Sequence, residues 1–182
     1  MDNEITDGML RDIMPNLPAL KRQLYLPFIN AAMKEFQIAN YLRASAFLAQ
    51  LAHESAELRY FEEIASGKAY EGRKDLGNTQ PGDGVKYKGH GPIQITGRAN
   101  HAAAGRALGL DLINNPTLIT KPENAFRSAG WFWDTRGLNA LADQRLLKAI
   151  TKKINGGLNG LQSRMAYYEL AKKVLVPTFL AQ

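Results

Sequence analysis

Two glutamates, Glu54 and Glu63, have the residue type and the spacing to do chemistry together. Glu54 ends the mostly apolar stretch that begins at Phe47, Glu63 follows nine positions later, and a polar loop extends from Tyr87 to Thr96. Hydrolysis of a glycosidic bond needs one carboxyl group to protonate the leaving oxygen and a second to activate water or attack the sugar. Two carboxyl groups beside a polar cleft therefore predict a glycosidase.

The spacing of the two glutamates sets a condition on the backbone between them. In one continuous helix, nine residues give about 900° of rotation and about 13.5 Å of rise. The side chains would then lie on opposite faces, too far apart to act on one bond. We therefore predict a helix break within Ser55–Phe61. Without such a break, Glu62 and Glu63 would be ordinary solvated surface charges.

Helical periodicity dominates the sequence and extended alternating runs are rare, which predicts a mainly α fold. We expect a short opening helix, capped by Thr6-Asp7 and ended before Pro15. Further helices are predicted at residues 18–36, 40–57, 97–108, 122–134, 143–154 and 161–175. The helix at 40–57 should carry His53-Glu54 in its last turn and bury Phe47, Leu48, Leu51 and Ala52. The helix at 18–36 should be kinked by Pro27 and bury Leu20, Leu24, Phe28, Ala31 and Ala32.

The segment from Ser66 to Pro92 is rich in glycine and charge and is too long for a simple connector. Long irregular loops in compact domains are usually functional or disordered. Tyr70, Val85 and Tyr87 can anchor this one, which favours function. We predict a glycine-rich loop that lines the cleft.

Length and composition favour one catalytic domain over residues 1–182, with no separate wall-binding domain. The chain has 182 residues, 45% of them hydrophobic, which is enough for one sizeable core. It contains no cysteine, so neither a disulfide framework nor a thiolate nucleophile is available. No signal peptide is expected, because charged residues interrupt every apolar stretch near the start. The sequence has no apolar run of about 20 residues, the length that would predict a membrane-spanning helix.

The net charge of +6, with a pI near 9.5, favours polyanionic partners such as nucleic acid, anionic lipid or the bacterial cell wall. Nucleic-acid binding is disfavoured, because the basic residues are scattered and are not interleaved with aromatic residues. His53-Glu54 begins like a zinc-protease motif, but Glu57 stands where the second histidine would be needed. We expect no metal and no cofactor.

Three motifs, in order, resemble one known family: the stretch Phe47–Ser55, the loop Tyr87–Asn100 and the segment Ile154–Gly157. Together they are similar to family 19 of the glycoside hydrolases, which comprises plant-type chitinases and related phage endolysins. The resemblance extends from Phe47 to Arg164. It implies a lysozyme-like, mainly α-helical fold and inverting hydrolysis of β-1,4-linked N-acetylated sugars.

The resemblance also implies roles for single residues. Glu54 matches the general acid, Glu63 the general base, and Thr96 the hydroxyl that helps to hold the attacking water. Further matches to polar residues near the sugar or the catalytic centre are Gln94, Asn100, Asn155, Arg164 and, at the opening of the cleft loop, Tyr87. Inversion requires carboxyl groups roughly 6.5–9.5 Å apart. Glu54 is expected to keep its proton through desolvation at an apolar helix end, and Glu63 to stay ionised in a wetter position.

Some residues depart from the family pattern or have a purely structural interpretation. His90, Ala99 and His101 stand where many relatives have arginine, an aromatic residue and tyrosine. His53 is either a packing histidine or a direct member of the site. The segment Asn155–Gly157, taken alone, could be only a helix C-cap turn.

The absence of an export signal and of disulfides, together with the basic charge, favours peptidoglycan over chitin as substrate. The loop Tyr70–Thr79 also looks like the version in phage and prophage endolysins. We therefore expect a monomeric endolysin that cleaves the glycan strand. It would stay in the host cytoplasm until a separate membrane pore protein releases it to the wall, where it would act. Alternatives are a chitinase, a catalytically inactive glycan-binding relative, and an injected wall-degrading effector.

Overall fold

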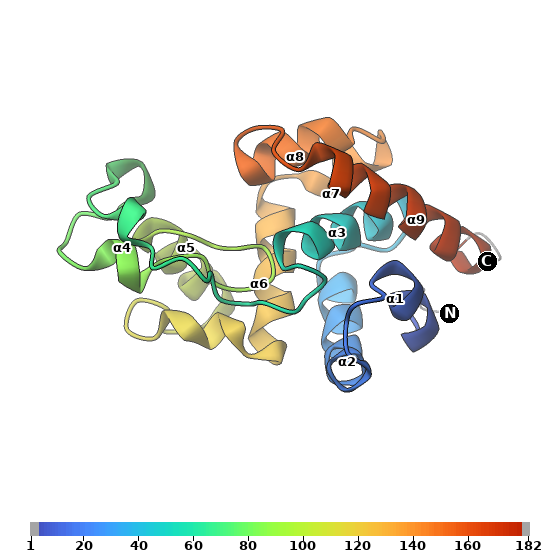
Figure 1. Ribbon diagram of the computed structural model, residues 1–182, viewed down its shortest axis with the longest axis horizontal. Helices are drawn as coiled ribbons and strands as arrows, with labels where there is room; N and C mark the ends of the chain where they lie inside the picture. Colours follow the sequence, from blue (N-terminus) through green and yellow to red (C-terminus); the bar gives the residue numbers. More distant parts are fainter. Residues whose placement is uncertain (1–3, 180–182) are drawn as a thin grey trace.

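A central apolar helix, α3 (Tyr41–Glu54), organises the larger part of the molecule (Figure 1). The computed structural model describes residues 4–179. Asn40 caps α3 by accepting a hydrogen bond from the backbone N–H of Arg43, and every residue from Ala44 to Ala52 is buried. Since a helix that is apolar on all sides must be covered on all sides, α3 needs several neighbours. It packs along α9 (Leu161–Phe179) and against α7 (Leu138–Asp143).

The other helices complete a larger lobe, built around α3, and a smaller lobe. α1 (Asp7–Ile13), α2 (Ala19–Glu35) and α8 (Leu147–Asn155) lie with α3, α7 and α9, while α4 (Asp83–Lys86) and α5 (Arg98–Leu108) lie on the opposite side of α6 (Pro122–Thr135) (Figure 1). Short 3₁₀ turns occur at Lys68–Tyr70, Lys74–Leu76 and Pro116–Thr120. Within residues 4–179 the extended chain forms only two isolated bridges, Glu62 with His90 and His90 with Ile95. The predicted mainly α fold is confirmed.

The buried face of α2 differs from the predicted one. Leu20 and Leu24 are 83% and 54% exposed, whereas Tyr25 and Ile29 are buried. Aromatic packing accounts for the difference, because the Tyr25 ring stacks on Phe61 at 5.1 Å and lies 5.5 Å from the ring of a second phenylalanine in α6. Two apolar stripes run along this helix, and contacts with distant residues decide which one is buried.

Helix boundaries were predicted correctly where capping residues mark them, and wrongly elsewhere. Thr6 caps α1, and α5 ends at Leu108, as expected. The helix expected at 143–154 begins only at Leu147, as α8, because Arg145 adopts a left-handed φ of 59°, and α7 before it was not predicted. The helix expected at 40–57 ends at Glu54. No helix among those that the structure describes is long and apolar enough to span a bilayer.

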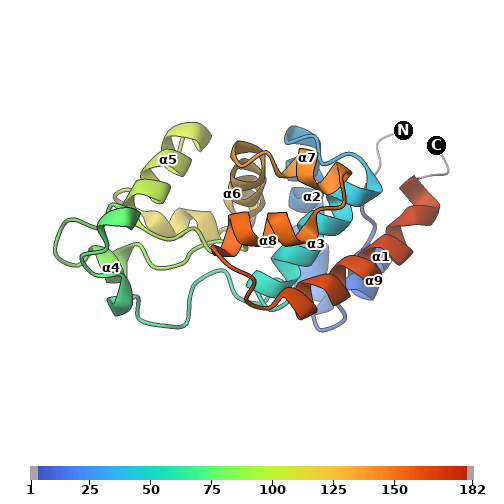
Figure 2. The same ribbon diagram turned by 90° about the horizontal axis from the view of Figure 1, so that it is seen from above.

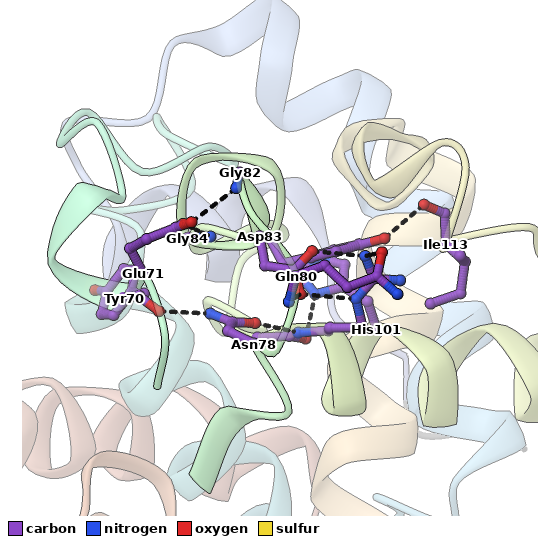
Figure 3. Close-up of polar contacts among 12 residues, drawn as sticks. Tyr70, Glu71, Asn78, Gln80, Gly82, Asp83, Gly84, His101 and Ile113 are labelled. Carbon is purple, nitrogen blue, oxygen red and sulfur yellow. Dashed lines mark hydrogen bonds and ion pairs between the residues drawn. The ribbon is translucent and has the colours of Figure 1, made fainter. Parts of the chain in front are cut away.

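Polar side chains hold the glycine-rich segment 66–92 in place (Figure 3). The Glu71 carboxylate accepts hydrogen bonds from the backbone N–H groups of Gly82 and Gly84, each at 2.7 Å. The buried Asp83 pairs with Arg98 at 2.6 Å, and this pairing lowers the pKa of Asp83. Directional bonds from polar side chains therefore contribute to the order of this loop.

Two buried histidines lie at the centre of the smaller lobe. His90 Nδ1 and His101 Nε2 are 3.0 Å apart, and His101 Nδ1 is 2.9 Å from the carbonyl oxygen of Gly97. Since a carbonyl oxygen only accepts, His101 carries its proton on Nδ1, and His90 donates to Nε2. Burial lowers the pKa of His101 to about 4 and also lowers the pKa of His90. Both rings are therefore neutral at neutral pH.

We expect stability to fall as the pH falls from 6.5 toward 4. The folded-state pKa of His101 lies below its ordinary value of 6.5. The unfolded chain therefore binds the proton first, and stability from the neutral ring is fully present only above pH 6.5. The loss from this residue is on the order of 3 kcal/mol. Urea unfolding of wild type and His101→Gln at several pH values measures it, and a difference between them that does not change with pH would contradict the assignment.

Candidate active site

The chain turns sharply after Glu54, as the spacing of the glutamates required. Residues 56–58 have φ values of 50°, 61° and 60°, so three successive non-glycine residues are left-handed. The Ser55 hydroxyl donates to the carbonyl oxygen of Leu51 at 2.6 Å and accepts from the backbone N–H of Leu58 at 2.8 Å. These bonds end α3 and turn the chain toward Glu63. The predicted helix break is confirmed.

A buried carboxylate, Glu57, holds this turn to two other elements. It is 5% exposed and accepts hydrogen bonds from the backbone N–H of Asn16 at 2.6 Å, from the Asn16 side chain at 2.9 Å and from the Tyr167 hydroxyl at 2.7 Å. Burial, and then the bond to Glu57, raises the pKa of Tyr167 to about 12. The turn is thereby tied to the α1–α2 connection and to α9.

Glu63 is positioned by the smaller lobe. Its Oε1 accepts a hydrogen bond from the Tyr70 hydroxyl at 3.0 Å, and its Oε2 accepts one from the backbone N–H of Gly89 at 2.9 Å. The backbone N–H of Glu63 also donates to the carbonyl oxygen of Gly89 at 2.8 Å. Tyr70 is held in turn by Asn78, which donates to its carbonyl oxygen (Figure 3).

Glu54 is positioned by the larger lobe. Arg164, which is buried in α9, donates from Nη2 to Glu54 Oε1 at 2.5 Å and from Nη1 to the side-chain oxygen of Gln50. Its Nε donates to the carbonyl oxygen of Asn159. Gln50 was not predicted as a site residue, although a polar residue four positions before Glu54 in an apolar helix is a usable signal, because residues i and i+4 share a helix face.

One surface cavity of about 300 Å³ is lined by both glutamates. His53, Tyr60, Ile64 and Gln94 also line it. His53 Nδ1 lies 3.0 Å from the Ser163 hydroxyl, and burial, followed by the charge of the nearby arginine of α9, lowers its pKa. His53 therefore packs against α9 and lines the cavity at the same time, so both interpretations of this residue describe part of its position.

The other predicted residues occupy different places. Thr96 and Asn100 are half-buried beside Gln94, linked by bonds from Thr96 Oγ1 to the Gln94 carbonyl oxygen at 3.0 Å and from Asn100 Nδ2 to the Thr96 carbonyl oxygen at 2.8 Å. Asn155 is exposed at the end of α8, where the following glycine has a φ of 75°, as in a C-cap turn. These three residues lie outside the lining of the 300 Å³ cavity.

Tyr87 was predicted to lie near the sugar at the opening of the cleft loop, but its side chain does not face the cleft. Its side chain is buried, and its hydroxyl donates to the carbonyl oxygen of Ile113 at 2.8 Å. Arg98 lies over its ring at 4.9 Å. An aromatic residue in a polar loop is also the natural core of that loop, and this is the use observed. Its role in the structure is to hold the loop together.

Glu71, another carboxyl group of the glycine-rich segment, also lies outside the cavity lining, and both of its oxygens accept backbone N–H bonds within the loop. Residues 4–179 hold no cluster of three histidine or acidic side chains that could bind a metal ion.

The sequence model of the chitinase class I family matches residues 31–142. The chain belongs to glycoside hydrolase family 19. It is 44% identical over 131 residues to an endochitinase of Arabidopsis thaliana, At2g43620. The matched region covers 68% of this chain and 44% of that protein. It is 30% identical over 171 residues to a glycosyl hydrolase family 19 domain-containing protein of Haemophilus influenzae, covering 77% and 84% of the two chains.

Solved structures agree with this membership. Chitinase C from Streptomyces griseus superposes with a TM-score of 0.78 at 25% identity, covering 94% of this chain and 92% of that one. A class IV family 19 chitinase from Zea mays gives a TM-score of 0.74 at 25% identity, with the same coverage. The chain spans less than half the length of the Arabidopsis relative. Family and fold therefore agree: the chain is a member of family 19 with a chitinase-like helical fold.

We predict that Glu57→Gln destabilises the protein by about 2–4 kcal/mol, because the new amide group would face the donors of Asn16 and Tyr167. Chemical unfolding followed by circular dichroism measures the change. Glu169→Gln is the control, since Glu169 makes only an exposed pair with Lys172 and should change stability by less than about 0.5 kcal/mol. Equal stabilities for the two variants would show that Glu57 does not hold the turn.

We predict that Gly89→Ala lowers glycosidase activity at least tenfold while the protein stays folded. A Cβ atom at Gly89 would lie 2.4 Å from Gln94 Oε1 and 3.2 Å from Glu63 Oε2, so both side chains must move. A shift of about 1 Å at a catalytic group can cost on the order of 100-fold in rate. Gly8→Ala, where a Cβ meets only ordinary contact, is the matched control. Unchanged turnover by Gly89→Ala would argue against a role for Glu63.

Proposed function

We propose that this protein is an endolysin-type glycosidase that cleaves β-1,4 bonds of the peptidoglycan glycan strand by an inverting mechanism. The observation that carries the proposal is that Glu54, from the end of an apolar helix, and Glu63, from the polar lobe, line one cavity. The turn between them removes the separation that a continuous helix would impose. Glu54 is the general acid and Glu63 the general base.

The contacts of each carboxyl group support these roles. When Glu54 gives its proton to the leaving oxygen it becomes negative, and the Arg164 guanidinium beside Oε1 stabilises that charge. Arg164 is itself fixed by Gln50 and by the Asn159 carbonyl oxygen, so it needs no rearrangement during the reaction. The sequence predicted apolar surroundings for Glu54, but its carboxyl group also contacts the Arg164 guanidinium.

Glu63 must be ionised to take a proton from water. Its two oxygens accept hydrogen bonds from the Tyr70 hydroxyl and the Gly89 N–H, and these bonds hold the carboxyl group in place. Gln94, which lines the same cavity, can donate to and accept from sugar hydroxyl and acetamido groups. Thr96, whose hydroxyl bonds to the Gln94 carbonyl oxygen, would help to hold the water through this neighbour.

The choice of peptidoglycan rests on charge, since a net charge of +6 favours an anionic polymer. Chitin is the second candidate substrate, because the Arabidopsis relative is named an endochitinase and the superposed Streptomyces and Zea structures are named chitinases. In the proposed setting the enzyme acts as a monomer at the bacterial wall, after a separate pore protein gives it access.

Glu54→Gln and Glu63→Gln should each lower activity at least 100-fold, because each removes one proton-transfer group while keeping its shape. The measurement is turbidity loss of outer-membrane-permeabilised Gram-negative cells, with identification of the released sugar ends. Glu123→Gln, an exposed position in α6, is the control and should act like wild type.

Wild-type turnover by Glu54→Gln would refute its role as the acid. Release of soluble sugar from chitin, with peptidoglycan left intact, would make chitin the substrate. Binding of glycan without cleavage of either polymer would identify an inactive relative.

A further inference from the structure

The net positive charge of this protein arises from the last quarter of the chain. Residues 1–135 contain 15 basic and 15 acidic residues and carry no net charge. Residues 136–182 contain 8 basic and 2 acidic residues, which is the whole net charge of +6. This segment comprises α7, α8 and α9, so the charge belongs to one side of the larger lobe (Figure 2).

The lysines of α8 form one open part of this charge. Lys148, Lys152 and Lys153 are exposed, while Leu147 and Ile150 are buried beneath them. Lys153 donates to a backbone carbonyl oxygen at 2.9 Å. None of the three pairs with a carboxylate in the part of the chain that the structure describes, unlike Lys172 in α9, which pairs with a glutamate. We call these three residues the α8 lysine face.

α8 is fixed to α3, the helix that brings Glu54 to the cavity. Gln50 of α3 donates to the Thr151 hydroxyl of α8 at 3.1 Å in the interior. The segment after α8 then runs to Gly160, whose backbone packs so closely on the His53 ring that an added Cβ would lie 2.1 Å from it. His53 lines the cavity. The helix that carries the α8 lysine face is therefore attached to the elements that hold His53 and Glu54, and Figure 2 shows α8 beside α3.

We propose that the α8 lysine face binds the carboxylates of peptide stems on the strand whose sugars occupy the cavity, and so selects an anionic glycan over neutral chitin. This inference rests on the proposed function and names the chemical feature of the substrate that the cavity alone does not recognise. Flexible ammonium groups suit such stems, because they act as point charges and need no fixed geometry. Poly-N-acetylglucosamine has no carboxylate and gains nothing from them.

The test compares two triple variants of the full chain. Lys148→Gln/Lys152→Gln/Lys153→Gln removes the α8 lysine face. Lys74→Gln/Arg106→Gln/Lys121→Gln removes three exposed charges from the smaller lobe and the start of α6. Both lower the net charge equally, so they separate position from total charge. Circular dichroism confirms that each variant is folded.

On soluble peptidoglycan strands at low salt, the α8 variant should lose about tenfold in kcat/KM and the control less than about twofold. The gap should close at high salt, because the Debye length falls to about 3 Å at 1 M. On neutral chitin oligosaccharides, the two variants should differ by less than about twofold. Equal losses for the two variants on peptidoglycan would overturn the inference and leave the proposed function standing.

A binding measurement separates this inference from the proposed reaction. In the Glu54→Gln background, co-sedimentation with intact sacculi should depend on the α8 lysines and should weaken when the peptide stems are removed enzymatically. If wild type fails to cleave peptidoglycan but this dependence holds, the proposed function fails and the α8 lysine face stands. Sedimentation that is indifferent to the α8 lysines would overturn it.

Discussion

The chain must reverse direction within three residues after Glu54, and the shared cavity depends on this reversal. A left-handed conformation costs a non-glycine residue roughly 1–2 kcal/mol, and residues 56–58 all adopt it. Three hydrogen bonds to the buried Glu57 carboxylate, at about 1.5–3 kcal/mol each, are enough to offset that strain. The turn is therefore held from outside by the α1–α2 connection and α9. Burial of Leu58 adds to the same constraint.

The two lobes are stabilised by different means, and the site lies where they meet. The larger lobe has an apolar core in which Phe47 packs against Trp133 at 5.4 Å, so its end of the site is set by dense packing. The smaller lobe relies on directional bonds such as the Asp83–Arg98 pair and on glycines that allow close approach. Glu54 takes its position from the first kind of structure and Glu63 from the second. Each carboxyl group thus has its own support.

Features written locally in the sequence were predictable. Capping by Thr6 and Asn40, the apolar run of α3 and the need for a break after Glu54 all follow from short segments. Features set by distant partners were not. The buried face of α2 depends on Tyr25 meeting aromatic residues of other elements, and the buried position of Tyr87 depends on a carbonyl oxygen 26 positions away. The motif fixed which residue types were present, but only the fold decided which of them reached the cavity.

The charge of the cavity itself gives the proposed α8 lysine face a physical purpose. Three glutamates line the cavity: Glu62 pairs with Lys88, Glu54 contacts Arg164, and Glu63 has no cation paired with it among the described residues. Glu63 must stay negative to act as a base, so it repels the carboxylates of an anionic strand. A positive face on α8 would attract such a strand without placing a cation against the base. Recruitment and proton abstraction can then be carried out by separate groups.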